Sequence, residues 1–377
     1  MKVLFISVGL VTSLSGVNST KGRYLSRHFF SDMTHTVNDR QLHQVDVQGG
    51  TLLGCYVPKF LRRVKLLAYP WIISNMLFRA VKRHRSIGGY DAIVAREPIV
   101  AGVIAVFVSR LLRLPLLVEM NGNYSSKVVW GEENYNLVSA VKRALVMRLI
   151  PFVLNRAGAI RVLYPWQLQP YSGLKDLSRK TFCFHEFTQV ENIMPSNNCK
   201  PYLLALGSPW FIKGFDLLIK AFVMIAEHHK DITLKVVGYF PRGGHKYLES
   251  LANGNKNIQI CKPVKHSDAQ LLISECKCFI LPSRTEAMGR VLLESMAHRK
   301  AIIASDADGI PHYVKNEING LIFESGDAGA LAKCISRILE DDKLRLNIAS
   351  NGERMVRSEY TEKQYADRYA AMLKSVL

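Results

Sequence analysis

Short apolar runs alternate with longer amphipathic segments in both halves of the chain. In the first half, the pattern predicts strands over 2–7, 90–95 and 114–120 and helices over 21–30 and 100–113. In the second half, it predicts a helix over 215–229 and strands over 202–207, 233–238, 257–261, 278–283 and 300–305. Beyond Glu324 the chain is predicted to be helical. This alternation predicts an α/β protein with two doubly wound, Rossmann-like domains.

A polar stretch, "MPSNNCKP" over 194–201, carries a proline at each side and predicts a linker between the two domains. The length of 377 residues gives each half enough chain for its own core. We therefore expect an N-terminal domain over 1–195 and a second domain that begins at 196.

The charge of the chain is concentrated in its first half. Residues 1–195 hold 25 Lys and Arg against 11 Asp and Glu, a net of +14, and the rest of the chain contributes +5 to the total of +19. The first half is therefore expected to face a polyanion. Seven scattered cysteines argue against a disulfide framework, and neither a signal peptide nor a membrane-spanning run is recognisable. These features predict a cytoplasmic protein.

One basic segment stands out in the first half. No acidic residue occurs from Val47 to Tyr90, while basic and aromatic residues interleave over 58–85. An ordinary helix with a solvated basic face explains this as well as attachment to an anionic membrane does. Nucleic acid is less favoured because no nucleic-acid motif accompanies the charge. The candidate membrane residues are Arg62, Arg63, Trp71, Lys82 and Arg83.

The stretch "SRTEAMGRVLLESMAHRKAIIAS" over 283–305 places Glu286 and Glu294 around the start of a helix that follows a buried strand. Ligands of open α/β sheets collect at the carboxyl ends of strands, where helix N-termini present unpaired amides to anions. The backbone of Met288, Gly289 and Arg290 is thus a candidate phosphate cradle, and a carboxylate beside it suits a ribose diol. A dipole partner and a solvated side chain would be the simpler explanation of the two glutamates.

Other chemical motifs are weaker. Asp306 and Asp308 form an Asp-x-Asp pattern, which is short enough to arise by chance, and no histidine pair has zinc spacing. We expect no metal site.

Four segments together resemble the C-terminal domain of glycosyltransferase family 4 (group 1). They are "GSPWFIKGFDLLIKAF" (207–222), "VVG" (236–238), "FILPSRTEAMGRVLLESMA" (279–297) and "GIPHYVKNEINGLIFESGD" (309–327). The first half is less similar, through "KVLFIS", the loop from Gly9 to Gly16 on the acceptor side, "YDAIVAR" and "PLLVEMNG". The resemblance implies retaining enzymes of GT-B architecture, with two facing domains and a final helix, here 358–377, that returns to the first. The second domain then covers 196–357.

The resemblance also implies roles at the donor site. Lys213 would pair with the donor diphosphate, Glu294 with the ribose, and Glu286 with the sugar. Gly207 and Gly238 would lie along the nucleotide, and Val264 along its base. Asn121 stands where the family often has a catalytic histidine, Ser208 where it has a phosphate-binding arginine, and Lys262 where a glycine is usual. Either Arg284 or Arg290 would then supply the missing cation.

The resemblance, together with the basic first half, implies a metal-independent hexosyltransferase without a cofactor, peripheral on the inner face of the plasma membrane. It would move a sugar from a nucleoside diphosphate, UDP in preference to GDP, to a glycan or lipid-linked acceptor in bacterial surface polysaccharide assembly. Three alternatives remain open at this point: a nucleotide-sugar epimerase of related fold, a non-catalytic nucleotide-binding scaffold, and a phosphorylase that uses pyridoxal phosphate.

Overall fold

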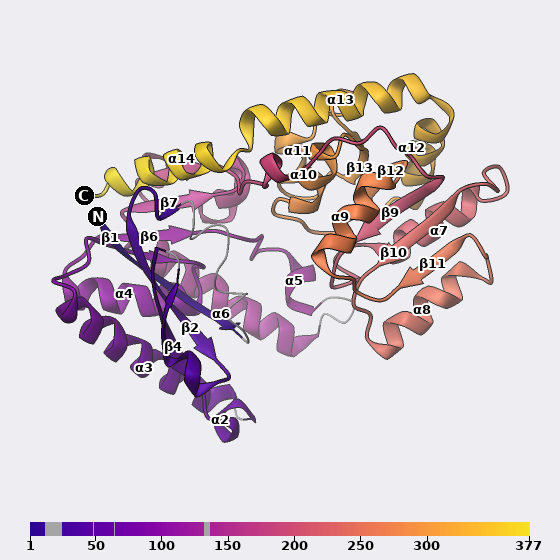
Figure 1. Cartoon of the computed structure of the whole chain (residues 1–377). Coiled ribbons are helices and arrows are strands. Elements are labelled where there is room, and N and C mark those ends of the chain that lie inside the picture. Colours follow the sequence, from indigo (N-terminus) through magenta and orange to yellow (C-terminus); the bar gives the residue numbers. More distant parts are fainter. Residues whose placement is uncertain (12–24, 48, 64, 132–135) are drawn as a thin grey trace. The chain divides into compact units, whose positions relative to one another are not determined.

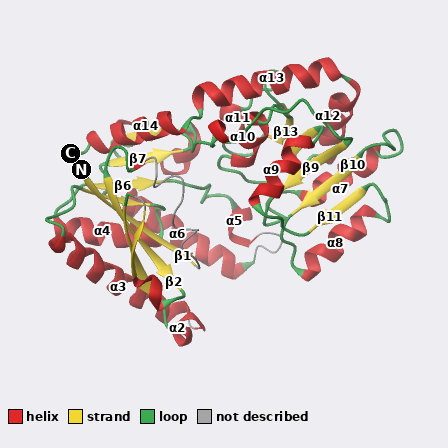
Figure 2. Ribbon diagram, viewed as in Figure 1, coloured by secondary structure: helices red, strands yellow, loops and turns green. Residues whose placement is uncertain are grey.

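The computed structural model describes residues 1–11, 25–47, 49–63, 65–131 and 136–377 (Figure 1). The chain forms two compact units. The first unit comprises Met1–Asn121, Ala144–Phe184 and Lys363–Leu377, and the second comprises Gly122–Arg143 and His185–Glu362. In each unit helices flank a central sheet (Figure 2).

In the described residues the first unit holds an eight-stranded sheet of order β3-β4-β2-β1-β5-β6-β7-β8. All neighbouring pairs are parallel except β3 with β4. Every residue of β5, β6 and β7 is buried, as expected for parallel strands covered on both faces. The strands are β1 (Lys2–Val11), β2 (Phe30–Val37), β3 (Gln44–Val47), β4 (Gly50–Tyr56), β5 (Ala92–Ala95), β6 (Leu116–Glu119), β7 (Ala159–Val162) and β8 (Thr181–Cys183).

The helices that precede residue 195 connect the strands of the first sheet, although α5 and the last 3-10 turn group with the second unit. The final helix of the chain, α14, returns to the first unit. They are α2 (Lys59–Arg63), α3 (Lys65–Ser86), α4 (Val100–Leu112), α5 (Lys127–Gly131), α6 (Leu137–Leu154) and α14 (Glu362–Lys374), with short 3-10 turns at Arg40–His43, Pro165–Tyr171, Ser178–Lys180 and Val190–Asn192. Tyr369 of α14 is fully buried, packs against Phe5 at 6.0 Å between ring centres, and donates a 2.6 Å hydrogen bond to Glu119. The yellow end of α14 therefore lies beside the N-terminus in Figure 1.

The second unit is a six-stranded parallel sheet of order β11-β10-β9-β12-β13-β14. The order reverses direction between β9 and β12, which is the switch point where ligands of doubly wound sheets bind. The strands are β9 (Tyr202–Leu206), β10 (Thr233–Val237), β11 (Ile258–Cys261), β12 (Cys278–Leu281), β13 (Ala301–Ser305) and β14 (Leu321–Phe323). The helices are α7 (Phe215–Ile225), α8 (Arg242–Ala252), α9 (His266–Glu275), α10 (Arg290–Ala297), α11 (Ile310–Tyr313), α12 (Ala328–Glu340) and α13 (Asp342–Glu359).

The structure differs from the sequence-based expectation in three places. The helix predicted over 21–30 is wrong at its end, because Phe30 already opens β2, and 21–24 lie outside the described residues. The division between units follows Phe184 instead of residue 195, and the return to the first unit begins at Lys363 instead of 358. The segment Gly122–Arg143 groups with the second unit, although it precedes the predicted linker.

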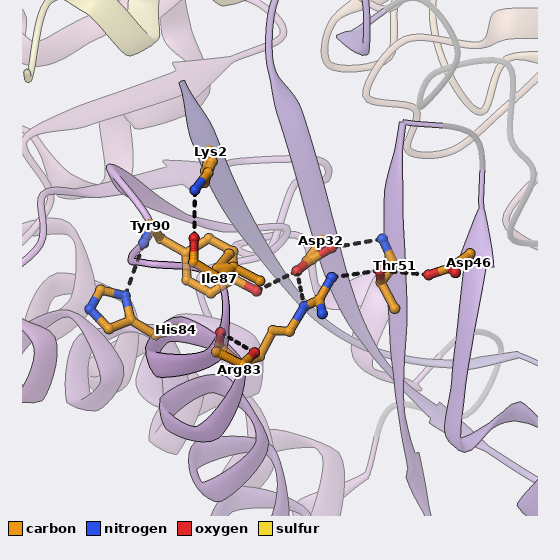
Figure 3. Close-up of polar contacts among 9 residues, drawn as sticks. Lys2, Asp32, Asp46, Thr51, Arg83, His84, Ile87 and Tyr90 are labelled. Carbon is orange, nitrogen blue, oxygen red and sulfur yellow. Dashed lines mark hydrogen bonds and ion pairs between the residues drawn. The ribbon is translucent and has the colours of Figure 1, made fainter.

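A buried carboxylate fastens α3 to the sheet of the first unit (Figure 3). Asp32 on β2 is fully buried and accepts hydrogen bonds from Arg83 Nε at 2.8 Å and from the Tyr90 hydroxyl at 2.6 Å. Thr51 completes the cluster by donating its amide to Asp32 at 2.7 Å and accepting from Arg83 at 2.8 Å. The prediction that Arg83 faces a membrane is therefore wrong, because its guanidinium is committed to a carboxylate inside the unit.

We expect Arg83→Ala to lower the free energy of unfolding by about 2–4 kcal/mol, since it leaves the Asp32 carboxylate buried without its cation. Urea unfolding followed by circular dichroism measures the change. Lys82→Ala is the matched control, because Lys82 is the exposed neighbour on the same helix and should change stability by less than about 0.5 kcal/mol. Equal stability of Arg83→Ala and wild type would contradict the anchoring role.

Candidate active site

A pocket of about 360 Å³ opens at the edge of the second sheet, next to the switch-point strand β9. It lies at the carboxyl ends of β9 and β10 and reaches α9 and α10. Five of the predicted donor-site residues line it: Gly207, Ser208, Gly238, Val264 and Glu294. The lining also includes residues that the sequence did not single out, namely Tyr239, Pro263, Ala269, Ile273 and Val291. Val264 is one of several apolar residues in the pocket lining, and Glu294 contributes a carboxylate to it.

Two glycines keep the strand ends close together. A Cβ on Gly238 would lie 2.1 Å from the carbonyl oxygen of Gly207, so no side chain fits between β9 and β10 there. Gly207 itself has φ of +150°, and a Cβ there would come within 3.2 Å of the Lys213 side chain. Side chains at these positions would disturb the floor of the pocket and displace Lys213.

Lys213 and Glu286 form an ion pair beside this pocket. Their side chains are only 18% and 13% exposed, and Ser283 Oγ lies 3.4 Å from the same carboxylate oxygen. Gly214 makes the approach possible: it has φ of +67°, and a Cβ there would lie 1.9 Å from the carbonyl oxygen of Pro282. The loop after β9 therefore lies directly against the loop that follows β12 and carries Glu286.

Glu294 belongs to a hydrogen-bonded chain that the sequence did not reveal. Gln270 of α9 donates to Glu294 Oε2 at 2.9 Å, and His298 Nε2 lies 2.8 Å from Gln270 Oε1. Burial lowers the pKa of His298, so the ring is neutral near pH 7. Arg290 Nη2 lies 3.8 Å from Glu294 Oε1, which is a loose ion pair. Gln270 thus holds the Glu294 carboxylate at the pocket wall.

The loop from Glu286 to Arg290 ends in an uncapped helix start. Gly289 has φ of +64° at the N-cap of α10, and no side chain caps this end. The buried Tyr313 hydroxyl donates to the carbonyl oxygen of Met288, and burial raises the pKa of Tyr313 well above its usual value, so the donor proton stays in place. Leu292 already donates its amide to the Gly289 carbonyl at 2.8 Å, so the amides of Arg290 and Val291 are the ones that this helix start offers to an anion.

Arg284 was predicted as a possible substitute for the phosphate-binding arginine, and the structure contradicts this. Its two terminal nitrogens each lie 2.7 Å from an oxygen of Asp216, and Nη1 also donates to the Phe211 carbonyl at 2.7 Å. Asp216 is buried, so this bidentate pair holds α7 to the loop after β12. Arg290, with a side chain that is 62% exposed, remains the candidate for the missing cation.

In the first unit, Asn121, which the resemblance placed at the catalytic histidine position, lies beside the buried Glu119. Asn121 Nδ2 donates to the Arg96 carbonyl at 2.7 Å and to Glu119 at 3.1 Å, so its amide hydrogens are already used. Its oxygen, 3.4 Å from Arg161, is the atom left for a sugar hydroxyl. Asn121 can therefore accept a hydrogen bond from a sugar hydroxyl through Oδ1. It has no amide hydrogen left to donate to a sugar oxygen, because both are used within the unit.

The other acceptor-side prediction concerns the loop after the first strand. His35 Nδ1 lies 3.2 Å from the carbonyl oxygen of Gly9. Burial lowers the pKa of His35 to about 4, so this ring is uncharged at neutral pH. Gly16 lies outside the described residues.

Of the predicted membrane residues besides Arg83, Lys82 is exposed and Trp71 is 42% exposed. The indole of Trp71 donates to the Tyr56 carbonyl at 3.0 Å, so only part of its ring faces outward. Arg62 and Arg63 are in α2, but their side chains lie outside the described part of the chain. Within the described residues, no helix is long and apolar enough to cross a membrane, and no group of three or more His, Cys, Asp or Glu side chains is arranged for a metal ion.

Comparison with solved structures defines the class of this fold. The chain is similar to sucrose-phosphate synthase from Thermosynechococcus elongatus, with a TM-score of 0.79 and 18% identity over 99% of this chain and 98% of the other. It is also similar to HepE from Anabaena in complex with UDP-glucose, with a TM-score of 0.73 and 17% identity over 100% of both chains. The fold is that of the GT-B glycosyltransferases.

Sequence comparison finds a family match over part of the chain. Residues 188–355 match the model of the glycosyl transferases group 1. The chain is 37% identical over 111 residues to the N,N'-diacetylbacillosaminyl-diphospho-undecaprenol alpha-1,3-N-acetylgalactosaminyltransferase of Campylobacter jejuni, covering 29% of each. It is 27% identical over 169 residues to the capsular polysaccharide biosynthesis glycosyltransferase CapM of Staphylococcus aureus, covering 44% of this chain and 43% of CapM. The matches thus span less than half the length of these curated relatives.

Proposed function

We propose that this protein is a metal-independent, retaining glycosyltransferase that takes a hexose-type sugar from a nucleoside diphosphate. The observation that carries the proposal is the Lys213–Glu286 ion pair beside a pocket that Glu294 lines from α10. A cation, an uncapped helix start and two carboxylates then surround a space at the carboxyl ends of parallel strands. This combination suits a nucleotide whose diphosphate is the leaving group.

The donor would lie along the floor formed by Gly207 and Gly238. Its base would contact Val264, its ribose hydroxyls would donate to Glu294, and its diphosphate would lie between Lys213 and the first amides of α10. Arg290, near that helix start, would add charge where the family usually has an arginine and this chain has Ser208. UDP is preferred over GDP, in line with the UDP-glucose bound by HepE.

Lys213 and Glu286 neutralise each other in the ligand-free site. A bound diphosphate offers Lys213 a more highly charged partner, so the cation would move to the phosphates and Glu286 would accept hydrogen bonds from the sugar. The acceptor hydroxyl would attack the anomeric carbon from the face that the diphosphate leaves, and its proton would pass to the departing phosphate oxygen. The new glycosidic bond forms as the bond between the anomeric carbon and the phosphate oxygen breaks, the nucleoside diphosphate leaves with the proton, and configuration is retained without a protein nucleophile.

The acceptor is proposed to be a glycan or lipid-linked sugar used in bacterial surface polysaccharide assembly. The support is the lipid-linked substrate in the name of the Campylobacter relative and the capsular role in the name of CapM. The first unit, which carries the net positive charge, would hold this acceptor and bind the protein peripherally on the inner face of the plasma membrane.

The docking surface proposed for the membrane comprises the outward faces of α2, α3 and α4, and differs from the sequence-based choice. Arg83 is removed from it by its bond to Asp32. Phe60 and Phe78 are added, with side chains that are 69% and 66% exposed. Further exposed residues of the same helices are Trp71, Lys82, Arg85, Phe107, Arg110 and Leu111. Exposed aromatics among cations suit the interface of an anionic bilayer.

The first test concerns Lys213. Lys213→Ala should cost about 2–4 kcal/mol of transition-state stabilisation, because the leaving diphosphate loses a preorganised cation. Transfer from a panel of nucleoside diphosphate sugars measures kcat/KM, and circular dichroism checks the fold. Lys235→Ala is the control, since Lys235 lies on β10 over the Tyr202 ring. A wild-type protein that binds nucleotide but transfers nothing would refute the enzyme and favour a scaffold.

The two glutamates are expected to respond differently. Glu294→Gln should weaken binding of the free nucleoside diphosphate, because the lost contact is to ribose, whereas Glu286→Gln should leave that affinity within about twofold and lower the transfer rate. Isothermal titration calorimetry with UDP and GDP separates the two cases. Equal loss of affinity in both variants would show that the roles are wrongly assigned.

The membrane surface is tested with vesicles of phosphatidylglycerol and of phosphatidylcholine. The triple variant Phe78→Ser, Lys82→Ser, Arg85→Ser should bind anionic vesicles at least about tenfold more weakly, since each cation near such a surface contributes about 1 kcal/mol. Activity on a short water-soluble acceptor should be unchanged. The control carries Arg179→Ser and Lys230→Ser, two highly exposed cations that are not on α2, α3 or α4. Equal binding by the triple variant and wild type would mean that α3 is an ordinary packed helix.

A further inference from the structure

Asp308 lies in the loop between β13 and α11 and belongs to the Asp-x-Asp pattern that the donor site leaves unused. It is a non-glycine residue with φ of +45°, a left-handed conformation that costs free energy and persists where surrounding contacts enforce it. The contacts of its carboxylate therefore indicate what this loop is built to hold.

The carboxylate of Asp308 holds the turn that carries Glu286. Its Oδ2 accepts the Glu286 backbone amide at 2.9 Å and also the Thr285 hydroxyl, and Thr285 is buried. The next residue adds a return contact, because the Gly309 amide donates to the Glu286 carbonyl at 3.1 Å. The backbone of Glu286 is thus held on both its amide and its carbonyl by two consecutive residues.

The second oxygen of Asp308 reaches a different segment. Asn123 Nδ2 donates to Asp308 Oδ1 at 2.6 Å. The orientation of the Asn123 amide is determined by Ser125, whose backbone amide and hydroxyl both lie near Asn123 Oδ1, at 3.2 and 2.6 Å. A backbone amide can only donate, so this atom is the oxygen and the nitrogen faces Asp308. Asp308 consequently joins the Glu286 turn to the Gly122–Arg143 segment of the same unit.

These partners argue against a metal ion on Asp308. Both carboxylate oxygens accept hydrogen bonds from N–H or O–H groups, and the positive ends of these donors occupy the space where a divalent cation would bind. The carboxylate is instead the acceptor at the centre of a backbone-holding cluster.

We propose that Asp308 is the positioning residue for Glu286, fixing where that carboxylate meets the donor sugar. This inference rests on the proposed function, in which Glu286 contacts the sugar and Glu294 contacts the ribose. Loss of Asp308 then affects the contribution of the sugar to binding and transfer, and leaves the affinity for the nucleoside diphosphate unchanged.

The test uses Asp308→Gly in the full-length protein. Glycine adopts positive φ without strain, so this variant removes the hydrogen bonds while it relieves the backbone. Calorimetry with UDP and UDP-glucose, with GDP and GDP-mannose in parallel, measures how much the sugar adds to affinity. We expect the variant to bind the free diphosphate within about twofold of wild type, to lose the sugar-dependent gain, and to show kcat lowered by about tenfold or more.

Two further variants separate positioning from a general effect on the loop. Asp308→Asn keeps an oxygen for the Glu286 amide and should restore most of kcat. Asp306→Asn is the matched control, because exposed Asp306 belongs to the same motif but accepts the Ser325 amide, and it should behave as wild type.

Two results would overturn the inference. One is an Asp308→Gly protein with wild-type kcat and an intact sugar-dependent gain; the other is an equal loss of affinity for the free diphosphate and the nucleotide sugar. Failure of the proposed function is distinct from both, since wild type would then bind the nucleotide sugar without transferring it, and the calorimetric comparison would still decide the role of Asp308.

Discussion

The ion pair between Lys213 and Glu286 is the contact on which the arrangement of the second unit depends. The two residues are 73 positions apart, and they meet because β9 and β12 are neighbours in a sheet whose order reverses between them. Gly214 lets the two loops touch, and the bidentate Arg284–Asp216 pair holds the start of α7 to the loop after β12. Opposite charges are thereby kept together in a place largely shielded from water, where they interact strongly.

Carboxylates perform the same structural task elsewhere in the protein. Asp32 holds α3 and the start of β5 to the first sheet, Glu119 binds α14 through Tyr369, and Asp308 holds the Glu286 turn. Each of these carboxylates accepts hydrogen bonds from segments that are distant in sequence. A buried or half-buried carboxylate without such donors would be strongly destabilising, so each cluster specifies one arrangement of its loops.

The alternation of apolar runs predicted β1, β5 and β6 of the first sheet and β9 to β13 of the second, because parallel strands covered on both faces leave a continuous apolar signature. The strands β2, β3, β4, β7, β8 and β14 were not foreseen, and the helix expected over 21–30 gives way to β2 at Phe30. The edge of a sheet is decided by which strands find partners, and local pattern carries little information about this. Glu286 and Glu294 were predicted from their spacing around a strand end and a helix start, which is a local pattern, whereas Lys213 was predicted only through the resemblance to a known family.

What the sequence determined by itself is therefore the fold class and the residue types at the strand ends, because both follow from short-range periodicity and spacing. Only the tertiary structure decided what those side chains do. Arg83 and Arg284 look like available cations in the sequence, yet each is bound to a carboxylate on another element. Gln270 carries no signal in the sequence, and Asp308 belongs only to a short Asp-x-Asp pattern that suggested a metal site. Both become partners of the two glutamates because packing brings α9 and the β13–α11 loop against the site. The sequence shows which residues are charged. Whether a charged side chain can bind a ligand depends on its neighbours in space, and these come from distant parts of the chain that meet only in the folded structure.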